Sequence, residues 1–98
     1  MNYKIELHPE AVLDLEQAFE WYEFKKKGLG KALVLELDKA LEKISLYPQH
    51  YQVIDFGLRG VLLNRFPYKV IFKLLNTKIV VVAIFHQKRN PKRLKMRL

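Results

Sequence analysis

The segment from His86 to Arg97 combines an imidazole with a dense group of cations. His86 closely follows an apolar run over residues 79–84, and six cationic side chains come after it: Lys88, Arg89, Lys92, Arg93, Lys95 and Arg97. An imidazole changes charge near neutral pH, and a guanidinium group pairs well with phosphate or carboxylate. The segment therefore predicts a binding site for an anionic partner.

Three residues earlier in the chain are candidates for the same site. Arg59 and Arg65 belong to the preceding strand and loop, and Tyr68 begins the next apolar run. Strands hold side chains more reproducibly than a loose tail does, so Arg59, Tyr68 and His86 would form the better ordered site. Each also has a structural alternative, because a histidine at a strand end often makes only structural hydrogen bonds and residues 92–98 suit a solvated tail.

The charge of the chain is unevenly distributed. Residues 1–50 hold seven Lys, no Arg and nine acids, a net charge of −2, whereas residues 51–98 hold eleven Lys and Arg against the single acid Asp55, a net charge of +10. All five arginines lie in the second half. This asymmetry favours an anionic partner over a basic surface that only confers solubility.

Several chemistries are absent from the sequence. There is no cysteine, and neither His8 nor His50 has a second ligand at metal-binding spacing, so we expect no metal site. Gly28 and Gly30 lack the remainder of a phosphate-binding loop, and Ser45 is the only serine, so we expect no cofactor and no serine nucleophile. The 98 residues suit one domain, and no run is long enough to span a membrane, so we expect a cytoplasmic protein.

The elements that must position these residues begin with a strand and two helices. Residues 2–7 alternate as a short strand, and Pro9 marks a helix start. Apolar residues recur at three- and four-residue steps from Val12 to Tyr22 and again over residues 33–44, while the acids of the first half fit a solvated helix face. A tight turn at residues 28–30 predicts an antiparallel helical hairpin, in which Leu37 is buried.

The second half has the pattern of a sheet. Apolar runs at 58–63, 68–74 and 78–85 are separated by Pro67 and by a turn at residues 76–77, which predicts an antiparallel meander. Tyr68, Val70, Phe72 and Leu74 share one face of the middle run, so the helices should cover that face and leave the other at least partly wet. The fold class is therefore α+β, a helical hairpin packed on a twisted antiparallel sheet after an N-terminal strand.

Two blocks of sequence resemble a known family. The blocks NRFPYKVIFK at residues 64–73 and AIFHQKRNP at 83–91, with the helical segments before them, resemble the RelE/ParE superfamily of toxins from bacterial type II toxin–antitoxin systems. The likeness is greatest to the ParE-like, plasmid-stabilisation branch and covers nearly the whole chain. It implies a single toxin domain over residues 1–98, with a basic tail at about 88–98, and a β-α-α-β-β-β order.

The resemblance implies two alternative mechanisms. ParE-like members inhibit DNA gyrase, and the basic sheet end would then be a recognition surface comprising Arg59, Arg65, Lys88, Arg89, Lys92, Arg93 and Arg97. RelE-like members cleave mRNA on the ribosome, which would make His86 the general acid or base and Arg59, Arg65 and Arg89 the groups that stabilise the phosphate charge. No tyrosine follows Tyr68, which weakens the RelE-like alternative.

The resemblance also implies a protein partner. Antitoxins of this class fold as they wrap the toxin, so we expect a toxin–antitoxin hetero-oligomer in which an acidic, amphipathic segment covers the active face. A basic nucleic-acid-binding module without toxin activity is an alternative that the +10 half alone would satisfy.

Overall fold

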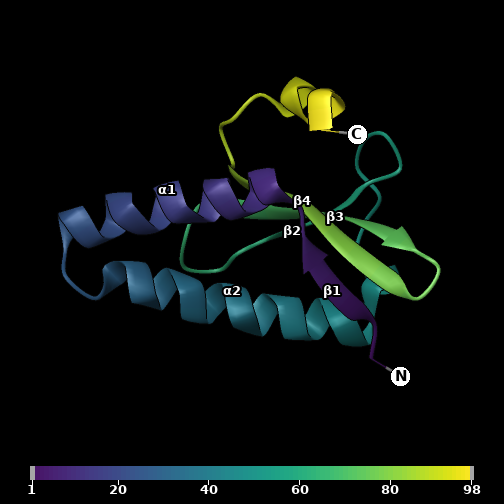
Figure 1. Cartoon of the computed structure of the whole chain (residues 1–98), viewed down its shortest axis with the longest axis horizontal. Helices are drawn as coiled ribbons and strands as arrows, with labels where there is room; N and C mark the ends of the chain where they lie inside the picture. The colour runs from purple at the N-terminus through teal and green to yellow at the C-terminus, as the bar shows by residue number, and fades with distance from the viewer. Residues whose placement is uncertain (1, 98) are drawn as a thin grey trace.

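The computed structural model describes residues 2–97, so Leu98, the last residue of the predicted basic tail, lies outside it. Strand β1 (Lys4–Leu7) leads into helix α1 (Pro9–Lys25), and helix α2 (Leu29–Leu46) returns antiparallel to it (Figure 1). The predicted start of α1 is confirmed: Pro9 occupies the first turn and the Nδ1 atom of His8 accepts a hydrogen bond from the Glu10 N–H at 3.1 Å.

Glu23 and two glycines fix the turn between the helices. The Glu23 carboxylate accepts hydrogen bonds from the backbone N–H groups of Gly28, Gly30 and Lys31, at 3.1, 2.8 and 3.2 Å. Gly28 adopts a left-handed conformation with φ of 90°. At Gly30 a Cβ atom would lie 2.7 Å from the Phe19 carbonyl oxygen, so only glycine lets the helices approach this closely.

The four strands form one mixed sheet in the order β1-β4-β3-β2. Strands β2 (Arg59–Leu62), β3 (Tyr68–Leu75) and β4 (Lys78–His86) pair antiparallel, which confirms the predicted meander. Strand β1 pairs parallel with β4, so the sheet is not antiparallel throughout as the sequence suggested. The pattern of a four-residue strand sets which residues face the core, but it does not set the direction of its neighbour.

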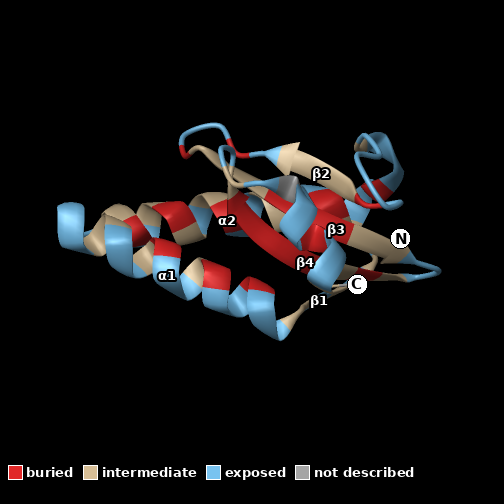
Figure 2. Ribbon diagram, turned by 90° about the horizontal axis from the view of Figure 1, so that it is seen from above, coloured by how far each residue is buried: buried red, intermediate tan, exposed pale blue. Residues whose placement is uncertain are grey.

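The helices cover one face of the sheet and build the larger core there. Leu33, Leu37 and Ile44 of α2 pack with Val70 and Phe72 of β3, and Leu37 is buried as predicted. On α1 the buried positions are Ala11, Asp14 and Ala18, while Val12 is 40% exposed. The small alanines let α1 lie close to β4, which shifts its buried face one position from the predicted apolar stripe. Figure 2 shows the buried positions along the inner sides of both helices.

The second face of the sheet is also covered. The short helix η2 (Pro91–Arg97) lies across it, and Leu94, which is fully buried, packs there against an apolar cluster (Figure 1). The cluster consists of Leu58, Ile71, Val82, Ala83 and Phe85. A bulge between Ile71 and Phe72 places Val82 and Ala83 together on this face. The basic segment is therefore folded rather than a loose tail, and this face is drier than the sequence pattern indicated.

Candidate functional site

A buried carboxylate lies where α1 meets the sheet. Asp14 is only 7% exposed, and its Oδ2 atom accepts hydrogen bonds from the Ile84 backbone N–H at 3.0 Å and from Arg97 at 2.6 Å. Its Oδ1 atom accepts a second bond from Arg97 at 3.0 Å, which makes the pair bidentate. Charge-assisted bonds of this geometry are the strong ones in proteins, so Asp14 ties α1 to η2.

The length of β1 explains why a carboxylate is needed here. The pairing of β1 with β4 ends at Leu7 and Val81, and β4 continues to His86. The edge of β4 past that point carries backbone groups that β1 does not reach. Asp14 accepts from the Ile84 N–H, and Arg97 donates to the Val82 carbonyl at 3.0 Å. Two side chains thus take the place of a strand along this part of the edge.

Arg89 and Arg97 are both held over the ring of Phe85. Their guanidinium carbons lie 4.1 and 4.7 Å from the ring centroid, within the range of a cation–π contact. Arg97 also pairs with Glu10, at 2.6 Å, and its side chain is only 8% exposed. Arg89 approaches Asp14 less closely, at 3.5 Å, with a third of its side chain exposed. Arg97 is therefore a structural anchor, and Arg89 keeps donors for another anion.

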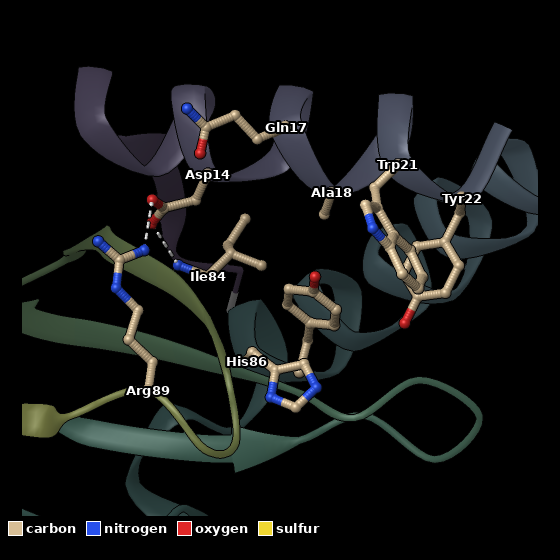
Figure 3. A pocket seen from close by; sticks show the side chains of 9 residues that line it. Asp14, Gln17, Ala18, Trp21, Tyr22, Ile84, His86 and Arg89 are labelled. Carbon is tan, nitrogen blue, oxygen red and sulfur yellow. Dashed lines mark hydrogen bonds and ion pairs between the residues drawn. The ribbon is translucent and has the colours of Figure 1, made fainter. Parts of the chain in front are cut away.

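A cleft of about 340 Å³ opens between α1 and the end of β4. Its walls are mainly aromatic, with polar groups at one end (Figure 3): Asp14, Gln17, Ala18, Trp21, Tyr22, Tyr68, Ile84, His86 and Arg89. Tyr68 and His86, which the sequence grouped together, meet edge to face with ring centroids 5.4 Å apart. Burial raises the pKa of Tyr68, with smaller contributions from Tyr22 and Asp14, so its phenol stays a hydrogen-bond donor.

The imidazole of His86 has a structural hydrogen bond. Its Nδ1 atom accepts from the Lys88 backbone N–H at 3.1 Å, which leaves Nε2 to carry the proton of the neutral ring. Within residues 2–97 no hydrogen bond joins His86 to a carboxylate. The cleft therefore offers an aromatic wall, a donor on His86 and the guanidinium of Arg89, an arrangement suited to binding an anionic group next to apolar surface.

Arg59 does not lie at this cleft. Its guanidinium donates to the carbonyl oxygens of Tyr51 at 2.7 Å and Gln49 at 3.4 Å, around the short helix η1 (Pro48–His50). In the register of the sheet Arg59 aligns with Phe72 and Phe72 with Val81, so His86 lies two strands away and roughly 15 Å further along. The structure therefore separates Arg59 from His86, which the sequence had grouped.

Arg65 lies in the loop between β2 and β3, beside α2. Its backbone N–H donates to the Glu36 carboxylate of α2, and its guanidinium lies 5.4 Å from the Phe66 ring centroid. The side chain lines a hollow beside α2 rather than the cleft that holds His86. Of the remaining predicted cations, Lys88, Lys92 and Arg93 are exposed.

Neither Asp14 nor the aromatic wall of the cleft was predicted from the sequence. The acids of α1 were expected on a solvated face, but Asp14 is buried. A signal was present, because Ala11, Asp14 and Ala18 recur at helical spacing and small residues mark a close helix contact. Trp21 and Tyr22 carried no comparable signal, since aromatic residues on a helix usually indicate core.

The part of the chain that the structure describes contains no group of three metal-ligating side chains. None of its helices is long and apolar enough to cross a bilayer.

Comparison with known proteins decides the family. Residues 5–91 match the family model described as "ParE toxin of type II toxin-antitoxin system, parDE". The chain belongs to the ParE toxin family. A search of curated proteins finds no match for this ParE-family chain.

The fold agrees with the family. The chain is similar to a solved structure described as "Chromosomal ParDE TA system from P. aeruginosa", with a TM-score of 0.78 and 15% sequence identity. The match covers 86% of this chain and 95% of that chain. At this identity the similarity shows the fold alone, and it confirms the predicted α+β architecture. The predicted resemblance to the ParE-like branch is confirmed by the family model.

Proposed function

We propose that this ParE-family toxin inhibits DNA gyrase in the cytoplasm and that a cognate antitoxin neutralises it. The observation that supports gyrase inhibition over RNA cleavage is the separation of the basic residues. Cleavage would require cations close to His86 to stabilise the charge of the transition state. Arg59 is bound to backbone carbonyl oxygens near η1, and Arg65 lies beside α2. Only Arg89 shares the cleft with His86.

The exposed cations then act as a recognition surface. Lys88, just before η2, and Lys92 and Arg93, on η2 itself, are exposed, and Arg89 is partly exposed near them. Charge on an exposed surface speeds association with a partner of opposite sign and fixes the orientation of the complex. We therefore assign these four side chains to target binding. Arg97, which is buried against Asp14, contributes by holding η2 in place.

The antitoxin is the proposed occupant of the cleft beside α1. Trp21 is 54% exposed and lies next to Tyr22. His86 lies in the middle of the same cleft, and Arg89 lies at its other end (Figure 3). An acidic, amphipathic segment would place apolar side chains on the aromatic wall and a carboxylate on Arg89. The similar P. aeruginosa structure is described as a ParDE system, which supports a partner of this kind.

Two alternatives remain as outcomes of the test. A RelE-like ribonuclease would use His86 as general acid or base, and a nucleic-acid-binding module would use the basic surface without toxicity. One purified preparation should be assayed in parallel for inhibition of gyrase supercoiling and for cleavage of mRNA on translating ribosomes. We expect supercoiling to be inhibited, and we expect the His86→Gln variant to inhibit it about as well as the unaltered toxin.

Two other outcomes would each establish one of the alternatives. Ribosome-dependent cuts that fall by roughly 10²–10⁴-fold in His86→Gln, with supercoiling unaffected, would establish the ribonuclease. Binding to nucleic acid with no effect in either assay, and no growth arrest on expression, would establish the non-toxic module.

A further inference from the structure

Phe56 has an unusual backbone conformation. It lies in a tight turn in which the Leu58 N–H donates to the Asp55 carbonyl at 2.9 Å, and its φ angle is 57°. Gly57, which follows it, has a φ of 73°. Two successive left-handed residues define a type I′ turn, whose first central position is normally Asn, Asp or Gly. A bulky aromatic residue there is strained.

Among residues 2–97, one other non-glycine residue has a left-handed backbone conformation, and it is of a type that tolerates this conformation. Asn76, with φ of 49°, lies in the turn between β3 and β4, and asparagine tolerates this conformation well. Phe56 is different, because its side chain is not buried in either apolar core and 48% of the residue remains exposed to solvent. Strained residues that do not contribute to packing are found mainly at functional positions.

Phe56 is part of a larger apolar surface. Val53 and Ile54, in the same loop, are 48% and 38% exposed. The loop and η2 lie side by side in Figure 1, where the teal segment before β2 reaches the yellow end of the chain. The ammonium nitrogen of Lys95 lies 6.0 Å from the Phe56 ring centroid, which joins the two segments.

A groove of about 140 Å³ runs between this loop and η2 on the second face of the sheet. Ile54, Ile71, Phe85 and Leu94 supply its apolar wall, and Lys69 and Arg89 supply positive charge. We define the Phe56 surface as this groove together with Val53, Phe56 and Lys95.

The charge around the Phe56 surface indicates its partner. Asp55 is the only acid among residues 51–98, and Lys92 and Arg93 on η2 add to the cations already named. A surface with an apolar centre and a cationic rim is complementary to an acidic protein surface that has exposed apolar side chains. Phe56 is the one exposed ring among the residues that define this surface, and Val53 and Ile54 beside it are aliphatic, which favours an apolar protein surface over successive stacked bases.

We propose that the Phe56 surface is where this toxin binds an acidic surface of its target protein. The inference rests on the proposed function for the identity of that target, gyrase. It assigns the target to the second face of the sheet and leaves the cleft beside α1 to the antitoxin. The linings of the cleft and the groove have only His86 and Arg89 in common. Each surface can therefore be altered without changing most of the other.

The sharpest test is Phe56→Asn. Asparagine suits a left-handed turn better than phenylalanine does, so this variant should fold with unchanged or higher thermal stability. We expect it to raise the concentration needed for half-inhibition of supercoiling by at least about tenfold, as loss of a central aromatic contact does. Lys95→Glu should have a similar effect. The matched controls are Leu75→Asn, with 42% exposure at the far end of β3, and Lys39→Glu on α2, which should leave inhibition unchanged.

A second readout separates this inference from the proposed function. Growth arrest on expression should be lost in Phe56→Asn and kept in Leu75→Asn, whichever protein is the target. Growth arrest without any effect on supercoiling would contradict the gyrase proposal, while loss of that arrest in Phe56→Asn would still support the surface.

Two results would overturn the inference. One is a stable, soluble Phe56→Asn protein that inhibits supercoiling and arrests growth as the unaltered toxin does. The other is tight binding of the unaltered toxin to a duplex DNA fragment without gyrase that Phe56→Asn and Lys95→Glu abolish, because the surface would then bind nucleic acid rather than an acidic protein.

Discussion

Arg97 and Asp14 are 83 residues apart in the sequence, yet they form two hydrogen bonds of 2.6 and 3.0 Å. The guanidinium and the carboxylate are both almost fully buried. The bond joins η2 to α1 over the open edge of β4. It also raises the pKa of Arg97, chiefly through the hydrogen bond to Asp14, so the cation persists at any pH at which the protein folds.

Removing the carboxylate should be costly. Asp14→Ala removes both Asp14 hydrogen bonds from the buried Arg97, which keeps only Glu10 and the Val82 carbonyl as partners, and it leaves the Ile84 N–H without its acceptor. We expect the free energy of unfolding, measured by urea denaturation, to fall by about 3–5 kcal/mol. Glu16→Ala, an exposed position on the same helix, is the control and should change it by less than about 0.5 kcal/mol. A change that small for Asp14→Ala would mean that the pair does not hold η2.

The hairpin turn should make stability depend on pH. Hydrogen bonds from backbone N–H groups, that of Gly28 most, lower the pKa of Glu23 below its ordinary value of 4.5 in the folded protein. The ionised form is therefore favoured by folding, so its contribution is fully present above the ordinary value and is lost as the pH falls through the lowered one. Glu23→Gln should reduce the thermal midpoint at pH 7 and flatten its decline on acidification. Equal slopes for the two proteins between pH 5 and pH 3 would contradict this assignment.

Gly30 should not tolerate a side chain. A Cβ atom there would lie 2.7 Å from the Phe19 carbonyl oxygen and 2.8 Å from the Phe19 ring, so α1 and α2 would have to move apart. Alanine normally stabilises a helix relative to glycine by up to about 1 kcal/mol, yet here overpacking should reverse the sign and cost about 1–3 kcal/mol. Chemical denaturation measures the difference. Any gain in stability for Gly30→Ala would show that the contact relaxes without strain.

The cleft should bind the antitoxin through Trp21. Trp21→Ala removes the exposed aromatic wall of the cleft, and we expect it to weaken binding of the cognate antitoxin by at least about 2 kcal/mol in titration calorimetry. Phe24→Ala is a suitable control, because Phe24 is 87% exposed on the same helix and lies outside the cleft. Toxicity of Trp21→Ala expressed alone should persist. If both variants bind the antitoxin equally well, the docking site lies elsewhere.

Much of this fold could be predicted from the sequence, because helix starts, turns and the buried faces of strands each depend on residues that are close together in the chain. Pro9 begins α1, glycines end the hairpin turn, and the alternation from Tyr68 to Leu74 gives the face of β3 that packs on the helices. The parallel pairing of β1 was not accessible in this way. It depends on the path of the chain through two helices, and no residue of β1 records it.

The site was less predictable for a related reason. His86 and Tyr68 were grouped correctly because they are partners in one antiparallel register. Arg59 was placed with them because it is basic and lies on the preceding strand, but the register of the sheet sets it opposite Phe72, four residues along β3 from Tyr68. Asp14 and Arg97 meet only in three dimensions, and the charge of each suggested a solvated surface. Long-range pairing of charges leaves no periodic signal in the sequence.

Arg89 connects the two proposed surfaces, because it lines both the cleft beside α1 and the groove beneath η2. One guanidinium group that binds a carboxylate on one side is less available on the other, so the two binding events are thermodynamically linked. Antitoxin binding then lowers affinity for the target by some factor, and the target lowers affinity for the antitoxin by the same factor. If Arg89 links the two sites in this way, neutralisation is a negative coupling between two partners that bind opposite faces of the sheet. Substituting Arg89 would then weaken the coupling even where both partners still bind.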